Sequence, residues 1–189
     1  MSELESPVTG AKIWFTSDTH FCHKNIIKYE DRPFKDIEEM NSELIRRWNE
    51  VVQPDDTVYH LGDVLLGPAE RFYPLVSALN GRKILIRGNH DGKSKDWYLE
   101  HGFDEVYPSL FLFASGYRIL LTHTPAPAPG MDYDLHFYGH VHSKGHRGDY
   151  PTVARNGACV CVERWRYYPV DLERLLSRCK TACITCPNI

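Results

Sequence analysis

Residues 84–91, which read Ile-Leu-Ile-Arg-Gly-Asn-His-Asp, constrain the fold more than any other part of the chain. The apolar run has no polar alternation, which predicts a short strand buried on both faces. Gly88 allows the backbone to turn sharply where that strand ends. Asn89, His90 and Asp91 then lie at the carboxyl end of the strand, where open α/β sheets place their ligands. An amide oxygen, an imidazole and a carboxylate in this position predict a metal site with an acid–base group beside it.

Four other predicted strands, at residues 12–17, 57–61, 117–122 and 135–138, also end in side chains that can bind a metal. In chain order these side chains are Asp18 and His20, Asp63, His123, and His140 and His142. Residues two apart in a strand point to the same side, so the two members of each pair can converge on one point. With Asn89 they make a set large enough for two metal ions that share a carboxylate. Oxygen and imidazole ligands without a thiolate suit Mn²⁺, Fe or Zn²⁺.

Helical patterns lie between these strands. The clearest covers residues 36–52, where Asp36 can cap the helix, Glu39 can close a capping box and apolar residues recur at helical spacing. Further helices are predicted at residues 68–80, 96–101 and 171–178, and further strands at 103–107, 110–114, 153–154 and 158–162. Residues 21–34 are predicted to form a loop with a short helical turn.

Length and composition set broad limits on the protein. The chain has 189 residues without an internal repeat or linker, which predicts one domain over residues 1–189. A net charge of −3 offers no broad basic face, so charge alone does not support a nucleic-acid partner. No apolar run is long enough to cross a membrane, and residues 1–10 lack the apolar segment of a secretory signal. We therefore expect a cytoplasmic protein.

The six cysteines are too few for a disulfide-dense scaffold, and we expect them to stay reduced. Cys179, Cys183 and Cys186 have a spacing that can hold an iron–sulfur cluster or zinc. A flexible tail over residues 179–189 is the alternative that we adopt.

The polar strand ends form recognisable motifs. They are Asp18-Thr19-His20, Gly62-Asp63, Gly88-Asn89-His90-Asp91, His123 and Gly139-His140-Val141-His142. On these motifs, which occur in the family order, the chain resembles the calcineurin-like metallophosphoesterase superfamily. The longer text of residues 15–26 resembles a branch of small single-domain bacterial and phage members. The resemblance implies an α/β fold, a four-layer α-β-β-α sandwich with two mixed β-sheets.

The resemblance also implies a division of the metal ligands. Asp18, His20 and His142 would hold a first metal. Asn89, His123 and His140 would hold a second, and Asp63 would bridge the two. His90 would stand beside the pair without binding either. The implied cofactors are two divalent cations, with Mn²⁺ as the first choice and Fe, Zn²⁺ or Ni²⁺ as alternatives.

One departure from the family concerns the support of His90. Serine/threonine phosphatase relatives carry a second Asp in Gly-Asp-x-x-Asp, and Leu66 stands at that position here. This argues against the protein phosphatase branch. Asp91 is adjacent to His90, and we include it with His90 as catalytic, although it can also serve only to brace the turn. His23 and Asn25 follow the first motif and are candidates to approach a bound phosphate.

The expected function is that of a metal-dependent phosphoesterase, with a phosphodiester as the expected substrate class. Two metals neutralise the phosphate and lower the pKa of water towards 7, so that a hydroxide bridging them can attack in line. His90 would be the general acid for the leaving group. The expected partner is a small phosphoester or nucleotide.

Two alternative functions stay open on the sequence. One is a non-catalytic metal-binding scaffold of the same fold, but retention of the full ligand set and His90 favours an enzyme. The other is a nuclease that acts on nucleic-acid ends. It would need an added basic or capping domain, which neither the length nor the charge offers.

Overall fold

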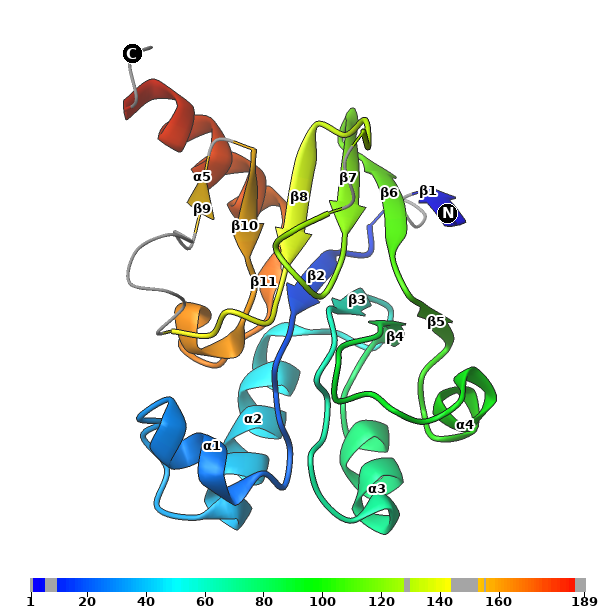
Figure 1. Ribbon diagram of the computed structural model, residues 1–189, viewed down its shortest axis with the longest axis vertical. Coiled ribbons are helices and arrows are strands. Elements are labelled where there is room, and N and C mark those ends of the chain that lie inside the picture. The colour runs from blue at the N-terminus through cyan, green and yellow to red at the C-terminus, as the bar shows by residue number, and fades with distance from the viewer. Residues whose placement is uncertain (1, 6–9, 128–129, 144–152, 155, 186–189) are drawn as a thin grey trace.

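Two mixed β-sheets pack face to face and are flanked by helices (Figure 1). The computed structural model describes residues 2–5, 10–127, 130–143, 153–154 and 156–185. The predicted α/β class and four-layer sandwich with two mixed sheets are confirmed.

The first sheet has six strands in the order β1-β6-β7-β8-β10-β9. Their bounds are β1 (Ser2–Glu5), β6 (Leu110–Ala114), β7 (Tyr117–Leu121), β8 (Leu135–Tyr138), β10 (Gly157–Cys159) and β9 (Val153–Ala154). Strands β7 and β8 are parallel neighbours, whereas β6 and β7 pair antiparallel. The carboxyl ends of β7 and β8 therefore lie at the same edge.

The second sheet has five strands in the order β11-β2-β3-β4-β5. Their bounds are β11 (Val170–Asp171), β2 (Ile13–Thr16), β3 (Thr57–His60), β4 (Arg82–Ile86) and β5 (Glu105–Tyr107). Strands β2 to β5 are parallel, and β11 runs antiparallel to β2. The parallel arrangement brings the ends of β2, β3 and β4 together at one edge.

Strand β4 is buried on both faces, as its unbroken apolar run predicts. Ile84 and Ile86 belong to the core between the two sheets, whereas Leu85 belongs to the core under the helices. Successive strand residues point to opposite faces, so a strand with apolar layers on both sides needs apolar residues at every position.

Four helices cover the outer face of the second sheet. They are α1 (Lys24–Tyr29), α2 (Ile37–Val51), α3 (Phe72–Ser77) and α4 (Lys95–Glu100), and each places buried apolar residues in that outer core. On the other side α5 (Leu172–Thr185) lies along β9 and β10 (Figure 1). Two short 3₁₀ helices, η1 (Ala69–Arg71) and η3 (Val162–Trp165), complete the described helical segments.

The start of α2 shows the predicted cap with one difference. The side chain of Asp36 accepts a hydrogen bond from the backbone N–H of Glu39 at 2.9 Å. The Glu39 carboxylate accepts from the backbone N–H of Lys35 at 2.7 Å instead of that of Asp36. Both interactions satisfy N–H groups near the helix start, where no carbonyl of the helix is available.

Three predicted segments differ from the structure. The helix predicted at 68–80 is η1 followed by the shorter α3, because Pro74 has no N–H and is tolerated only near the start of an α-helix. The strand predicted at 158–162 ends at Cys159, and Val162 begins η3. The predicted tail at 179–189 is wrong for its first part, since α5 continues to Thr185 and Cys179 is buried. Cys186 lies outside the described residues.

Candidate metal centre

The metal-ligand candidates come from five strands of both sheets. Asp18 follows β2, Asp63 follows β3 and Asn89 follows β4, while His123 and His140 follow β7 and β8. In Figure 1 the arrowheads of β7 and β8 point to the region where β2 ends. The sandwich thus gathers residues that lie more than a hundred positions apart, as the strand-end pattern predicts.

The first group consists of Asp18, His20 and His142. One ligand atom from each of the three lies within 4.8 Å of the others. Nε2 of His142 is 3.5 Å from Oδ1 of Asp18, and Nε2 of His20 is 3.9 Å from the same oxygen. These three side chains are the ones that the resemblance assigns to a first metal.

The second group is centred on Nε2 of His123. That nitrogen lies 3.0 Å from Oδ1 of Asn89, 3.1 Å from Nδ1 of His140 and 3.5 Å from Oδ2 of Asp63. Nδ1 of His123 donates to the backbone carbonyl of Leu61 at 2.7 Å. Because that bond fixes the proton on Nδ1 in a neutral ring, the lone pair is on Nε2 and points at the group.

Asp63 connects the two groups through a single oxygen. Its Oδ2 is 3.6 Å from Nε2 of His20 and 3.5 Å from Nε2 of His123. Its Oδ1 accepts the backbone N–H of His90 at 2.9 Å, which fixes the carboxylate plane. Burial raises the pKa of Asp63, with the nearby Asp18 acting in the same direction. A buried carboxylate pair of this kind is stabilised by a bound cation.

The protonation states and an unsatisfied oxygen fit cations at these groups. Burial would raise the pKa of Asp18, but the neighbouring His142, His123 and His20 outweigh it and lower that pKa to about 2. Burial lowers the pKa of His20 to about 2, which leaves a neutral imidazole able to donate a lone pair. Oδ1 of Asp18 is buried and has no hydrogen-bond partner among the described residues. An anionic oxygen without a donor, beside the neutral imidazole of His20, is what a cation site requires.

Two residues that the sequence did not indicate hold the first group in place. Glu163 accepts from Nδ1 of His142 at 3.1 Å and pairs with Arg32 at 2.6 Å. Arg32 also donates to the backbone carbonyls of Asp18 and Thr19, at 2.7 and 2.8 Å. A carboxylate on the far nitrogen orients a metal-binding imidazole and raises its basicity. Burial would lower the pKa of His142, but Glu163 raises it to about 9.

The backbone at the site is strained. Residues in the left-handed region include most of the ligand candidates, namely Asp18, His20, Asp63, His140 and His142, with φ between 45° and 71°. Residues other than glycine rarely adopt this conformation, and such strain gathers at functional sites. Gly88 is needed for a different reason: a Cβ there would overlap Oδ1 of Asp63 and lie 2.6 Å from its backbone nitrogen.

His90 and Asp91 occupy different places. Nε2 of His90 lies 3.9 Å from Oδ2 of Asp63, and its side chain is 43% exposed. Asp91 is buried, and its carboxylate accepts the backbone N–H groups of Asp63, Val64 and Gly88 at 2.8, 3.2 and 2.8 Å. Through these contacts Asp91 braces two ligand-bearing turns.

The two substrate-binding candidates also separate. The ring of His23 lies 5.5 Å from that of His20, between centroids, and its pKa is lowered by burial. Asn25 is exposed on α1, two residues further along the chain. The structure therefore brings His23 to the edge of the ligand groups and leaves Asn25 on the helix surface.

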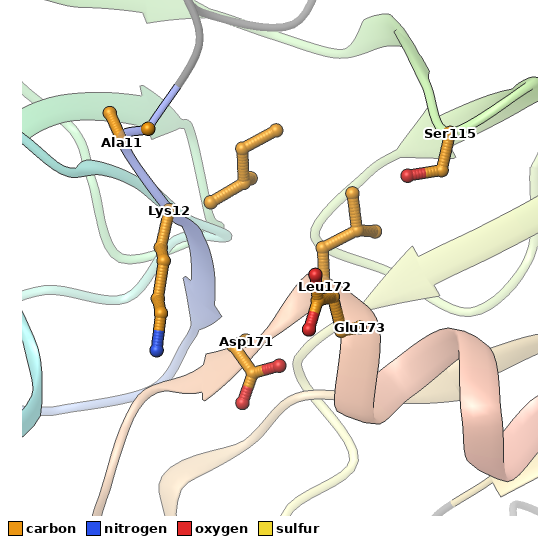
Figure 2. A pocket seen from close by; sticks show the side chains of 8 residues that line it. Ala11, Lys12, Ser115, Asp171, Leu172 and Glu173 are labelled. Carbon is orange, nitrogen blue, oxygen red and sulfur yellow. The ribbon is translucent and has the colours of Figure 1, made fainter.

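A hollow of about 330 Å³ lies at the other end of β2 from the ligand groups. It is lined by Lys12, Ser115, Asp171 and Leu172, among others. Figure 2 shows the Lys12 side chain extending away from Ser115, so these polar groups do not converge on one point. The strand ends, and not this hollow, form the candidate site.

The chain is similar in sequence to proteins from an archaeon and a bacteriophage. Within the described residues, no helix combines the length and apolar character needed to cross a bilayer. The chain is 39% identical over 170 residues to an uncharacterised protein of Methanocaldococcus jannaschii, which covers 87% of this chain and 89% of that protein. It is 43% identical over 82 residues to the gene 66 protein of Mycobacterium phage L5, which covers 42% of this chain and 39% of the phage protein.

A solved structure and a family model extend the comparison. The crystal structure of AQ665, a protein of unknown function from Aquifex aeolicus, matches with a TM-score of 0.70 and 32% identity over 89% of this chain and 99% of that one. The model of the calcineurin-like phosphoesterases matches residues 11–144, a span that includes both ligand groups. The chain therefore belongs to the calcineurin-like phosphoesterase family.

Proposed function

We propose that this phosphoesterase is a phosphodiesterase that works with two divalent cations, Mn²⁺ being the first choice. The observation that carries the proposal is the position of Oδ2 of Asp63, 3.6 Å from His20 of one ligand group and 3.5 Å from His123 of the other. One carboxylate oxygen shared by two groups is the arrangement of a two-metal site. Two bound cations supply charge neutralisation at the phosphate and a water of lowered pKa.

The chain's own residues divide the work. Asp18, His20 and His142 hold one cation, Asn89, His123 and His140 hold the other, and Asp63 is shared. Glu163 and Arg32 position His142 and the Asp18 backbone. Asp91 positions the turns of Asp63 and Asn89. Asn89 contributes an oxygen without charge, which keeps the site electrophilic towards an anionic phosphate.

His90 protonates the leaving oxygen. Its exposed imidazole stands 3.9 Å from the shared carboxylate, so it can reach a substrate at the mouth of the site. An alkoxide leaving group needs such a proton, and general acid catalysis contributes on the order of 10²–10⁴-fold in rate. His23, beside His20, is placed to contact a phosphate oxygen.

A metal-by-substrate panel tests the proposal. Metal-free protein is reloaded with Mn²⁺, Ni²⁺, Zn²⁺ or Mg²⁺ and assayed on a chromogenic phosphomonoester, a chromogenic phosphodiester and cyclic nucleotides. We expect the diester to be hydrolysed fastest, and Mn²⁺ to support the highest rate. Failure of every combination, in protein shown to bind two metals, would point instead to a non-catalytic metal-binding scaffold.

A further inference from the structure

A groove of about 690 Å³ lies between the end of α2, η3 with the turn that follows it, and α5. Its lining includes Arg164, Arg166, Arg174 and Arg178, with Trp165 and Tyr168 between them. Asp171 is the acidic residue of this lining. We infer that this arginine groove binds the phosphates of a single-stranded nucleic acid. The inference rests on the proposed function, since it names the class of phosphodiester that reaches the metal centre.

Three arginines of the groove differ from nearby arginines in their ion pairs. The neighbouring Arg46 and Arg47 pair with Glu43, and Arg46 also pairs with Glu50. By contrast, no carboxylate of the described residues forms an ion pair with Arg166, Arg174 or Arg178. A chain with a net charge of −3 thus concentrates positive charge at one place. Such local patches attract polyanions even when the net charge is negative.

The Trp165 ring lies against both groove arginines of α5. The guanidinium carbons of Arg178 and Arg174 lie 5.0 and 5.6 Å from the centroid of the Trp165 ring. Trp165 itself is buried, and its ring N–H donates to the Cys159 carbonyl at 2.9 Å. An arginine placed over a ring keeps the N–H groups on its edge available, and its planar fork matches the geometry of a phosphate.

The turn that presents Arg166 is strained. Arg166 and Tyr167 are consecutive left-handed residues, with φ of 55° and 65°. Arg47 donates to the carbonyl of Arg166 at 2.9 Å, and the Tyr167 N–H donates to the Val162 carbonyl at 2.8 Å. Strain that the surrounding contacts maintain is typical of functional segments. Here it holds a positively charged side chain at the groove.

One lining residue of the groove contacts a residue of the first ligand group. Nε of Arg164 donates to the backbone carbonyl of His142 at 2.6 Å, and Glu163, the preceding residue, binds the His142 ring. In this proposal, a strand whose scissile phosphodiester lies at the two ligand groups continues past Arg164 into the groove. A nucleic-acid strand is a chain of phosphodiesters, so it supplies both the reacting group and the phosphates that follow it.

The test measures binding apart from cleavage. The probe is a fluorescein-labelled single-stranded oligodeoxynucleotide, with the same sequence as RNA and as duplex DNA in parallel arms, titrated with metal-free protein over a series of salt concentrations. We expect Arg174→Gln with Arg178→Gln to weaken binding at least tenfold. Losing two phosphate contacts should also lower the slope of log affinity against log salt by about 1.4. The charge-matched control is Lys35→Gln with Lys180→Gln, two exposed positions outside the lining.

The possible results distinguish a failure of the groove proposal from a failure of the proposed function. The groove proposal would be overturned if both double variants lost the same amount of oligonucleotide affinity. It would also be overturned if the groove variant lost no affinity and kept an unchanged melting temperature. Binding to vesicles of anionic lipid without binding to any oligonucleotide would overturn it as well. Hydrolysis of the chromogenic diester by the wild-type protein is measured in parallel. Its absence, with strand binding intact, would overturn the proposed function and leave the groove standing.

Discussion

At the scale of single residues, the role proposed for His90 is the most specific in chemical terms. It lies 3.9 Å from the shared carboxylate and is 43% exposed, so its side chain can be removed without opening the core. We expect His90→Ala to keep both metals and to lose about 10²–10⁴-fold in turnover of a diester with a poor leaving group. The loss should shrink for a leaving group that needs no proton, such as a nitrophenolate. Wild-type turnover of both substrates would remove His90 from the mechanism.

Glu163 allows a second test at this scale, because it contacts the His142 ring without belonging to either of the two ligand groups. Its carboxylate is held by Arg32 and by Nδ1 of His142. Glu163→Gln removes the charge and keeps the shape, and we expect about 10–100-fold weaker metal binding at the first group, measured by calorimetric titration. The control is Glu43→Gln, a surface carboxylate that pairs with Arg46 and Arg47. Unchanged metal affinity in Glu163→Gln would show that His142 needs no such support.

At the scale of elements, the turn after β4 depends on close approach to the turn after β3. A Cβ on Gly88 would lie 2.6 Å from the backbone nitrogen of Asp63, whereas one on Gly92 would meet nothing within 4 Å. We expect Gly88→Ala to destabilise the fold by about 1–3 kcal/mol and to displace the shared carboxylate, with loss of activity. Gly92→Ala, four residues on in the same segment, should change stability by less than about 0.5 kcal/mol. Urea denaturation of both variants measures these changes in the free energy of unfolding.

Strand β8 carries a buried histidine outside the ligand groups, and it predicts a pH dependence. Burial lowers the pKa of His136 to about 4, and its ring lies 2.7 Å from the Thr122 hydroxyl. The unfolded chain then binds a proton at this residue near pH 6.5, while the native state does so only near pH 4. The neutral His136 side chain therefore costs the native state no stability above about pH 6.5, and the free energy of unfolding declines as the pH falls towards 4.

The size of the effect can be measured with one variant. Between pH 7 and pH 5 the wild-type protein should lose about 2 kcal/mol of unfolding free energy through His136. His136→Gln keeps a hydrogen-bonding group near Thr122. Its loss of unfolding free energy over the same pH interval should be smaller than that of the wild-type protein by about 2 kcal/mol. Equal pH dependence of the two proteins in urea denaturation would contradict the assigned pKa.

At the scale of the whole molecule, the sequence predicted what is local and missed what depends on packing. The strands before Asp18, Asp63 and His123 could be predicted because each combines an apolar run with a polar end. Nothing near Glu163 marks it, since its partner Arg32 lies 131 residues away. The sequence also could not show that Asp91 braces the turns, because its partners at Asp63 and Val64 follow a different strand.

Contacts between distant segments also explain why the sequence predicted a flexible tail where α5 continues, and why it did not predict the arginine groove. The sequence shows α5 as a short amphipathic pattern, but the burial of Cys179 against the first sheet carries the helix on to Thr185. Net charge averages over the chain, so it could not show that arginines of η3, its following turn and α5 face one hollow. Both features arise only when segments far apart in the sequence meet.

The central claim is that two cations share Asp63, and a crystal soaked in Mn²⁺ tests it most directly. Anomalous difference maps at the manganese edge should show two peaks, one on each side of the Asp63 carboxylate and roughly 3.5–4 Å apart. One should lie among Asp18, His20 and His142, and the other among Asn89, His123 and His140. A single peak at saturating Mn²⁺, or peaks away from Asp63, would contradict the two-metal account.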